Sequence, residues 1–283
     1  MTMATLRATD EQSTHRPRLY DFAEGFGSVY GRYVRNHLCQ RLISQYSIHS
    51  VLEAPCNSES YFASPGTQSF VFAQRGCRVS LLHPEHDVIQ KTRDFWSALG
   101  MPDTPAFHHT DLYHLPFDSD HFDLVWNFDY IPLFDDPARF IGEMARVSKD
   151  LVMVIVPNCK NIGYPLHALL NVVQRRQSQF GSRAWMGIKP VAQAMRSSGV
   201  KVIESGLVDI PPWPGFDALS PIGKVVRRNT VEARDDERTD EEVEQMLKKL
   251  TFIEYAPVPQ LFKIPFSHQL FVIGQKTKPA RTG

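Results

Sequence analysis

The chain has 283 residues, 42% of them hydrophobic, which is enough to bury a substantial core in one large domain or one domain with a lid. Acidic and basic residues balance at 31 each, which argues against a nucleic-acid binder held by phosphate contacts. Apolar runs stay short of the roughly 18–20 residues that cross a bilayer, so we expect no membrane partner.

Residues 1–19 are polar and lack the apolar stretch of a signal peptide, so we expect a disordered lead-in before a single domain at 20–283. The four cysteines are far apart and show no CxxC spacing. This pattern disfavours structural zinc and a disulfide framework, and it favours a reduced, cytoplasmic protein. His83 and His86, and the pair His108-His109, invite a metal interpretation. No cysteine or carboxylate cluster accompanies them, so we predict no metal site.

Strands and helices alternate along most of the chain. Apolar residues recur at helical spacing from Tyr30 to Leu42 and predict an N-terminal helix. The predicted strands are 51–54, 77–82, 106–110, 123–128, 151–156, 200–208 and 268–275. Helices are predicted at 89–99, at 189–198, and after Asp136, which precedes Pro137 as a helix cap. This order predicts an α/β fold: a doubly wound, Rossmann-like, mostly parallel seven-stranded sheet with helices on both faces.

Two segments fall outside the repeating pattern, at about 158–188 and 211–266. The second begins with several prolines and contains a helix for which Thr239 and Glu242 fit a capping box. Long insertions at strand ends usually form lids or substrate walls, so we predict that role for both. The aromatic residues of the second segment suggest an apolar pocket, with simple packing as the alternative: Trp213, Phe216, Phe262 and Phe266.

The turn after the first strand contains no glycine, although glycines usually let the backbone approach a ligand there. Glu53 ends the strand, and Pro55, Asn57 and Glu59 occupy the positions where glycine is expected. Proline fixes φ at about −65° and has no N–H to donate. The loop must therefore take a different path.

Two stretches resemble class I S-adenosylmethionine-dependent methyltransferases. The segment from Asp111 to Val125 is similar to the family pattern D-x-x-x-L-P-F-x-x-x-x-F-D-L-V. The segment from Phe140 to Lys149 resembles the E-x-x-R-V-L-K helix of the same family. The resemblance covers roughly Tyr20 to Val208 and resumes at the last strand. It implies this fold and S-adenosylmethionine as the cofactor.

The resemblance also assigns cofactor-binding residues. Glu53 matches the acidic residue that closes the first strand, and Ala54, Pro55 and Cys56 begin the altered glycine loop. For Cys56, a small buried filler is the simpler interpretation.

Further positions match cofactor-binding residues. Asp111 matches the acceptor of the adenine amino group, and Leu112 the backbone N–H donor to the ring. His83, followed by Pro84, stands where the family has an acid that binds the ribose hydroxyls. Histidine can still accept one hydroxyl through a ring nitrogen.

The segment from Asn127 to Ile131 matches the region that lines the methionine part and faces the substrate. We therefore predict Asn127 as a cofactor residue, and Asp129 and Tyr130 as catalytic residues. Tyr130 packing under a lid is the alternative. Tyr30 is predicted to contact the cofactor, because a sulfonium is attracted to aromatic faces. An apolar helix stripe is the competing interpretation for Tyr30.

The predicted function is in-line methyl transfer to a small molecule by a monomer or homodimer. Asp129 would act as general base for an amine or hydroxyl acceptor. Two alternatives stay open. The first is an enzyme that cyclises or cleaves the aminobutyrate chain of the cofactor and releases methylthioadenosine. The second is a non-catalytic binding protein that keeps the fold.

Overall fold

The structure is a computed structural model that describes residue 20 and residues 26–56, 67–101, 105–165, 181–211 and 239–277. Several predictions lie outside the described residues. They concern the lead-in at 1–19, the loop positions Asn57 and Glu59, and the aromatic residues Trp213 and Phe216.

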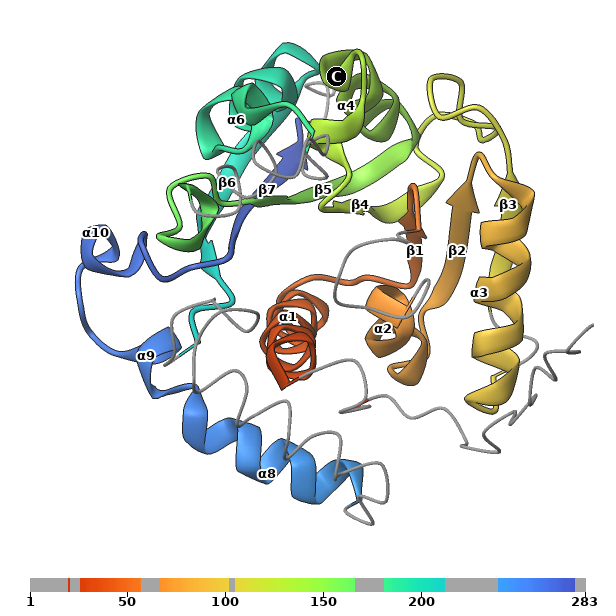
Figure 1. The fold of residues 1–283 in the computed structure, drawn as a ribbon. Helices are drawn as coiled ribbons and strands as arrows, with labels where there is room; N and C mark the ends of the chain where they lie inside the picture. The colour runs from red at the N-terminus through yellow and green to blue at the C-terminus, as the bar shows by residue number, and fades with distance from the viewer. Residues whose placement is uncertain are drawn as a thin grey trace, which may run out of the picture.

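Within the described residues, seven strands form one sheet of order β3-β2-β1-β4-β5-β7-β6 (Figure 1). The strands are β1 Ser50–Glu53, β2 Arg78–His83, β3 Ala106–His109, β4 Phe122–Phe128, β5 Ser148–Pro157, β6 Val200–Val208 and β7 Gln269–Lys276. Strands β3, β2, β1, β4 and β5 pair in parallel, whereas β7 runs antiparallel between β5 and β6. The predicted mostly parallel, doubly wound sheet is confirmed.

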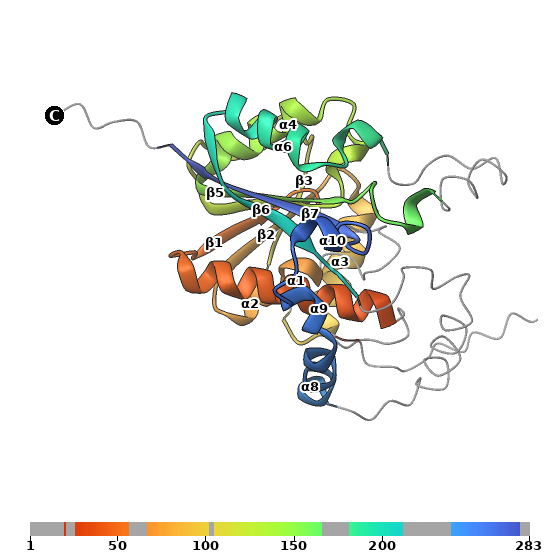
Figure 2. The same ribbon diagram turned by 90° about the vertical axis from the view of Figure 1, so that its left-hand side faces the viewer.

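Helices cover both faces of the sheet, as the two perpendicular views show (Figures 1 and 2). One face carries α1 Phe26–Gln45, α2 Phe70–Gln74 and α3 His86–Ala98, and the other carries α4 Pro137–Val147 and α6 Ile188–Ser197. Each face has its own buried cluster. Residues 151, 153 and 155 of β5 enter one cluster, and residues 152, 154 and 156 enter the other. This alternation explains the uninterrupted apolar run of that strand.

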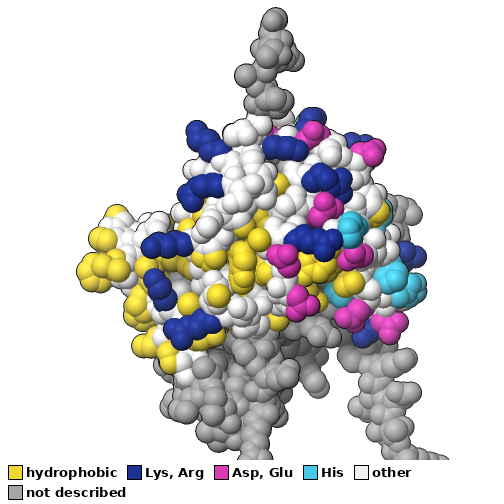
Figure 3. Space-filling view, turned by 90° about the horizontal axis from the view of Figure 1, so that it is seen from above, with side chains coloured by type: hydrophobic (Ala, Val, Ile, Leu, Met, Phe, Trp, Pro, Cys, Tyr) yellow, Lys and Arg dark blue, Asp and Glu magenta, His cyan; other side chains and the backbone are white. Residues whose placement is uncertain are grey.

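The chain after β6 returns to the sheet through α8 Asp240–Leu250, α9 Phe252–Tyr255 and α10 Gln260–Lys263. Thr239 and Glu242 form the predicted capping box at the start of α8. Figure 3 shows hydrophobic side chains gathered on a projecting part of the surface, on the side where α10 lies in Figure 1. Phe262 and Phe266 are exposed at 66% and 45%. The other two aromatic residues of the suggested apolar pocket lie outside the described residues, so that pocket stays a prediction.

The sequence pattern did not predict the short helix α2, and it misplaced several strand ends by one to three residues. Helix α2 has only five residues, too few for a helical period to be recognised. No helix in the described part of the chain is both long enough and apolar enough to cross a membrane.

Candidate functional site at the carboxyl edge of the sheet

Parallel pairing brings the ends of β1, β2 and β4 together at one edge of the sheet. Glu53 pairs in register with Leu81 on one side and Trp126 on the other. The rings of His83 and Tyr130 meet edge to face, with centroids 6.1 Å apart. Predicted site residues from three separate strands are therefore neighbours at this edge.

Glu53 is fully buried, and the chain beyond it turns along β2. The Ala54–Pro55 peptide is cis, and the Cys56 amide donates to the carbonyl oxygen of Leu82 at 2.7 Å. Burial, together with the negative charge of Glu53, raises the pKa of the Cys56 thiol. A thiol that stays protonated is a poor nucleophile, so the structure favours Cys56 as a buried filler.

His83 is buried, and its Nδ1 accepts a hydrogen bond from the Glu85 amide at 3.0 Å. Because Nδ1 accepts, the proton of the neutral ring belongs on Nε2. With Nδ1 occupied as an acceptor, Nε2 would act as a donor, whereas the sequence predicted that His83 would accept a ribose hydroxyl. The ribose contact itself stays a prediction. Pro84 helps to fix this turn, since its carbonyl oxygen lies 2.8 Å from Nε2 of His109.

Asn127 is buried and ties two loops together. Its Nδ2 donates to the Ala54 carbonyl at 2.8 Å, and its Oδ1 accepts from the amides of Tyr130 and Ile131 at 3.3 and 3.2 Å. The side chain therefore fixes the turn after β4 against the end of β1. Its contact with a cofactor stays a prediction.

Asp111 is exposed, and both of its carboxylate oxygens are used in a local turn. Oδ2 lies 2.9 Å from Nδ1 of His114, and Oδ1 accepts from the Tyr113 amide at 2.9 Å. These hydrogen bonds, His114 first, lower the pKa of Asp111. Leu112, in contrast, is buried in the core cluster on the α4 face of the sheet. The adenine contacts of both residues stay predictions.

Tyr30 lies fully buried in the core cluster beneath α1, and its hydroxyl donates to the Ile210 carbonyl at 3.2 Å. Burial raises the pKa of this phenol. The described contacts of Tyr30 match the interpretation as part of an apolar helix stripe. Its contact with a cofactor remains untested.

The sequence reasoning missed a buried polar network centred on Arg35 of α1. Arg35 Nε donates to Gln68 Oε1 at 3.1 Å, and Nη1 donates to Gln269 Oε1 at 3.1 Å. Gln269 in turn donates through Nε2 to Asp129 Oδ2 at 2.5 Å. One sequence signal pointed here: Arg35 is three residues from Leu38 and seven from Leu42, so it falls on the buried stripe of the predicted helix.

Asp129 and Asp209 approach this network from two turns of similar shape. Each is the first residue after a strand, and their φ angles are 55° and 63°. Asp209 Oδ2 lies 3.8 Å from Arg35 Nη1 and 3.3 Å from His268 Nδ1. Gly31 makes room for the network, because a Cβ there would lie 2.7 Å from Asp209 Oδ2 and 2.8 Å from Arg35 Nη1.

The pKa of Asp129 is raised to about 7, mainly because burial penalises its charged form. Arg35 and the hydrogen bond from Gln269 act in the opposite direction, and the charge of Asp209 adds to the rise. Gln269 thus stands between the guanidinium and the carboxylate. Asp129 is therefore a carboxylate that titrates near neutral pH at the carboxyl edge of the sheet.

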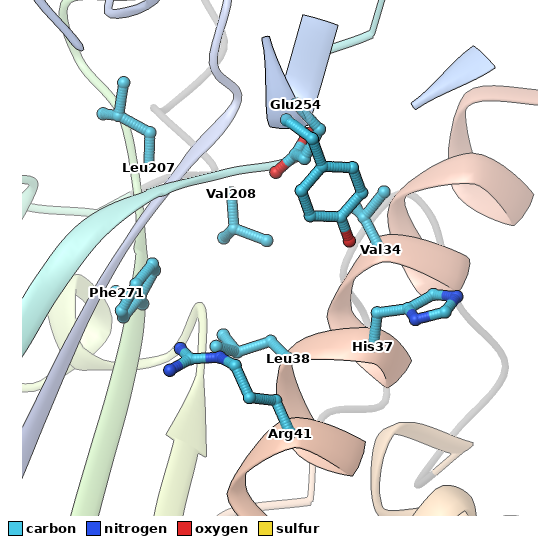
Figure 4. Close-up of a pocket in the computed structure, with 9 residues that line it drawn as sticks. Val34, His37, Leu38, Arg41, Leu207, Val208, Glu254 and Phe271 are labelled. Atoms are coloured by element: carbon cyan, nitrogen blue, oxygen red, sulfur yellow. The ribbon is translucent and has the colours of Figure 1, made fainter. Parts of the chain in front are cut away.

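A separate hollow of about 350 Å³ lies between α1, β6, β7 and α9. Figure 4 shows Leu38 and Arg41 extending from α1 toward the side where Phe271 and Leu207 lie, whereas the His37 ring points away from it. Arg41 is held by Glu204 through contacts of 2.7 and 2.8 Å. The hollow contains none of the predicted site residues.

The histidines do not gather into a metal centre in the described part of the chain. His86 and His109 meet with ring centroids 6.0 Å apart, whereas His108 packs on Phe117. No group of three or more His, Cys, Asp or Glu among the described residues could hold a metal ion.

Part of the chain matches a known protein family. Residues 63–156, about one third of the chain, match the family described as a methyltransferase domain. The match begins beyond the glycine-free positions and ends in β5. No curated protein matches the sequence.

Solved structures of methyltransferases share the fold. A protein from Bacillus halodurans described as a methyltransferase is 16% identical, with a TM-score of 0.52 over 86% of this chain and 99% of its own. Magnesium protoporphyrin IX methyltransferase from Synechocystis, solved with S-adenosylhomocysteine, is 11% identical, with a TM-score of 0.51 over 88% and 84%. Geranyl diphosphate C-methyltransferase from Streptomyces coelicolor is 13% identical, with a TM-score of 0.50 over 85% and 76%.

The chain has the class I methyltransferase fold. The match to a methyltransferase domain implies S-adenosylmethionine as the cofactor and supports a transferase activity.

The chemistry of the carboxyl edge fits this cofactor. Glu53 and His83, at the ends of β1 and β2, could hold hydroxyl groups of the cofactor, and Tyr130 could offer an aromatic face to a cation. These contacts stay predictions. Arg35 Nη2 and Asp129 Oδ1 are enclosed and have no hydrogen-bond partner among the described residues. Enclosed polar groups of this kind normally have a partner, so the edge can accept a polar ligand.

Proposed function

We propose that this methyltransferase-fold protein transfers a methyl group from S-adenosylmethionine to a small molecule. The methyltransferase-domain match over residues 63–156 carries the proposal. The balance of 31 acidic and 31 basic residues supports a small acceptor over a nucleic acid. Geranyl diphosphate and magnesium protoporphyrin IX, named for two structural relatives, are small molecules of this kind.

The chain itself supplies alignment and a proton acceptor. When bound, the cofactor supplies a methyl group that a sulfonium already activates. Asp129 would take the proton from the acceptor nitrogen or oxygen, and the freed lone pair would be the group that receives the methyl from the bound cofactor. A pKa of about 7 suits this task, because general bases work best near the operating pH. The ring of Tyr130 packs between His83 and Phe134 beside this carboxylate.

A second candidate rests on the glycine-free turn after Glu53. A rebuilt turn next to the methionine part of the cofactor could let its aminobutyrate chain fold back and react on itself. The protein would then cyclise or cleave that chain and release methylthioadenosine. In the third candidate, the fold serves binding alone.

The deciding experiment is calorimetric titration with S-adenosylmethionine, followed by mass spectrometry after incubation with a panel of small acceptors. Formation of S-adenosylhomocysteine with one acceptor supports methyl transfer. Methylthioadenosine supports the second candidate. No binding at millimolar cofactor would contradict both enzymatic candidates. Asp129→Asn should lower turnover with a protonated acceptor by about 100-fold or more.

Four free cysteines, three of them buried, support a reducing compartment such as the cytoplasm. We further propose a monomer or homodimer that acts without a nucleic acid or membrane partner. Gel filtration with light scattering would test the oligomeric state.

A further inference from the structure

The network around Arg35 has hydrogen-bonding capacity that the described protein groups do not use. Four enclosed atoms have no partner among the described residues: Arg35 Nη2, Gln68 Nε2, Asp129 Oδ1 and Asp209 Oδ1. Arg35, Gln68 and Asp209 are themselves at least nine-tenths buried, with exposures of 3%, 2% and 6%. Such groups are costly to leave unpaired, so together they indicate a polar ligand.

The four atoms belong to one connected cluster. Gln68 contacts Arg35 directly at 3.1 Å, and Asp209 lies 3.8 Å from the same guanidinium. Asp129 is joined to Arg35 through Gln269. Residues from α1, from the turn before α2, and from the turns after β4 and β6 therefore converge on one place.

The cluster offers two kinds of contact. Arg35 Nη2 and Gln68 Nε2 are N–H donors, and a guanidinium is a preferred partner of carboxylates. Asp129 Oδ1 and Asp209 Oδ1 are acceptors, which suit an ammonium group. A ligand that carries both a carboxylate and an ammonium offers a partner to each kind of atom. An α-amino acid group is the smallest common group of this kind.

We propose that Arg35, Gln68, Asp129 and Asp209 bind a zwitterionic α-amino acid group. The proposal rests on the proposed function, because S-adenosylmethionine ends in such a group and an amino-acid acceptor is the other source. Pro55 has no N–H to offer in the glycine-free turn, so side-chain donors would replace backbone donors. With an amino-acid acceptor, Asp129 would also take the ammonium proton. With the cofactor as ligand, Asp129 would hold that ammonium, and another group would act as base.

The test compares S-adenosylhomocysteine with methylthioadenosine, which lacks the amino acid end, by calorimetry on the purified chain. A panel of free amino acids is titrated separately. The variants are Arg35→Met and the milder Gln68→Met, checked for folding by circular dichroism. Arg41→Met is the matched control, because Arg41 lies on the same helix outside the network and contacts Glu204.

If the cofactor is the source of the amino acid group, the network variants should weaken the binding of S-adenosylhomocysteine roughly tenfold to a hundredfold. Their binding of methylthioadenosine should not change. If an acceptor is the source, the network variants should abolish binding of a free amino acid. Their affinity for S-adenosylhomocysteine and methylthioadenosine should then equal that of the wild type. The proposal is overturned if both nucleosides bind all variants equally and no amino acid responds, a result that leaves cofactor binding intact. If neither nucleoside binds the wild type, the proposed function fails, whereas the amino acid titration still tests the network.

Discussion

At the scale of single residues, the two aspartates after β4 and β6 explain how a polar network forms inside an apolar core. Both adopt a positive φ, which is uncommon for residues with a Cβ, although aspartate tolerates it better than most. Strained backbone of this kind is concentrated at functional sites. The two turns direct carboxylates toward Arg35, and Gly31 supplies the space that they need.

The raised pKa of Asp129 predicts how stability depends on pH. Burial penalises the ionised form of Asp129 in the folded chain. The protein therefore loses stability as pH rises from 3.8, the ordinary pKa of this carboxyl, to about 7, its pKa in the folded chain. Asp129→Asn removes that cost. The free energy of unfolding of the variant minus that of the wild type should therefore rise by about 1–3 kcal/mol from pH 4 to pH 8. Urea unfolding at the two pH values measures this, and an equal difference at both would contradict it.

Gly31 and Gly142 form a matched pair of glycines within helices. Gly31→Ala should destabilise the protein by about 1–2 kcal/mol, because its Cβ would collide with buried groups of Asp209 and Arg35. Gly142→Ala should instead stabilise the protein by about 0.5–1 kcal/mol, because the added Cβ would lie 3.6 Å from its nearest neighbour, Ser198 Oγ, and would not collide with it. Thermal and urea unfolding compare them. Stabilisation by both substitutions would show that the space at Gly31 is not needed.

At the scale of elements, the sequence predicted those with strong local signals. Asp136 and Pro137 start α4 as expected, and Asp136 accepts from the Arg139 amide at 3.1 Å. Helix α2 escaped because its five residues carry no period. The path of the turn after Glu53 could not be predicted, because without glycine the turn matches no known backbone pattern. The sequence showed only that this turn departs from the family pattern.

The cap of α4 gives a prediction at this scale. Asp136→Ala removes the side chain that satisfies an exposed helix amide, so it should destabilise the protein by about 1 kcal/mol. Asp135→Ala, at the neighbouring exposed position, should change stability by less than about 0.5 kcal/mol. Urea unfolding of both variants measures the difference. Equal effects would show that the cap does not stabilise α4.

At the scale of the whole molecule, the fold was predictable and much of the site was not. Alternating strands and helices specify which strand ends meet, and this brings Glu53, His83 and Tyr130 together. The Arg35 network joins residues more than 200 positions apart, such as Arg35 and Gln269. No local pattern links such residues. Only the tertiary packing of α1 against the sheet reveals the contact.

The distribution of cysteines over the folded molecule predicts their reactivity. Cys39, Cys56 and Cys77 are buried, and burial raises the pKa of Cys39 to about 12. Cys159 is only partly buried. A thiol reagent such as Ellman's should therefore label one site quickly and the other three only as the chain unfolds. Cys159→Ser should remove the fast phase, and two or more fast thiols in the wild type would refute this assignment.

The buried indole of Trp126 has a further consequence. Its N–H donates to Ser69 Oγ at 2.9 Å, and its ring meets Phe72 edge to face. Ser69 directly follows Gln68, and Trp126 is the strand partner of Glu53. Trp126 is therefore a direct neighbour of the two segments that carry Gln68 and Glu53, which we propose as ligand contacts. Its fluorescence, isolated as the difference between wild type and Trp126→Phe, gives the protein a built-in optical signal for occupancy of that edge.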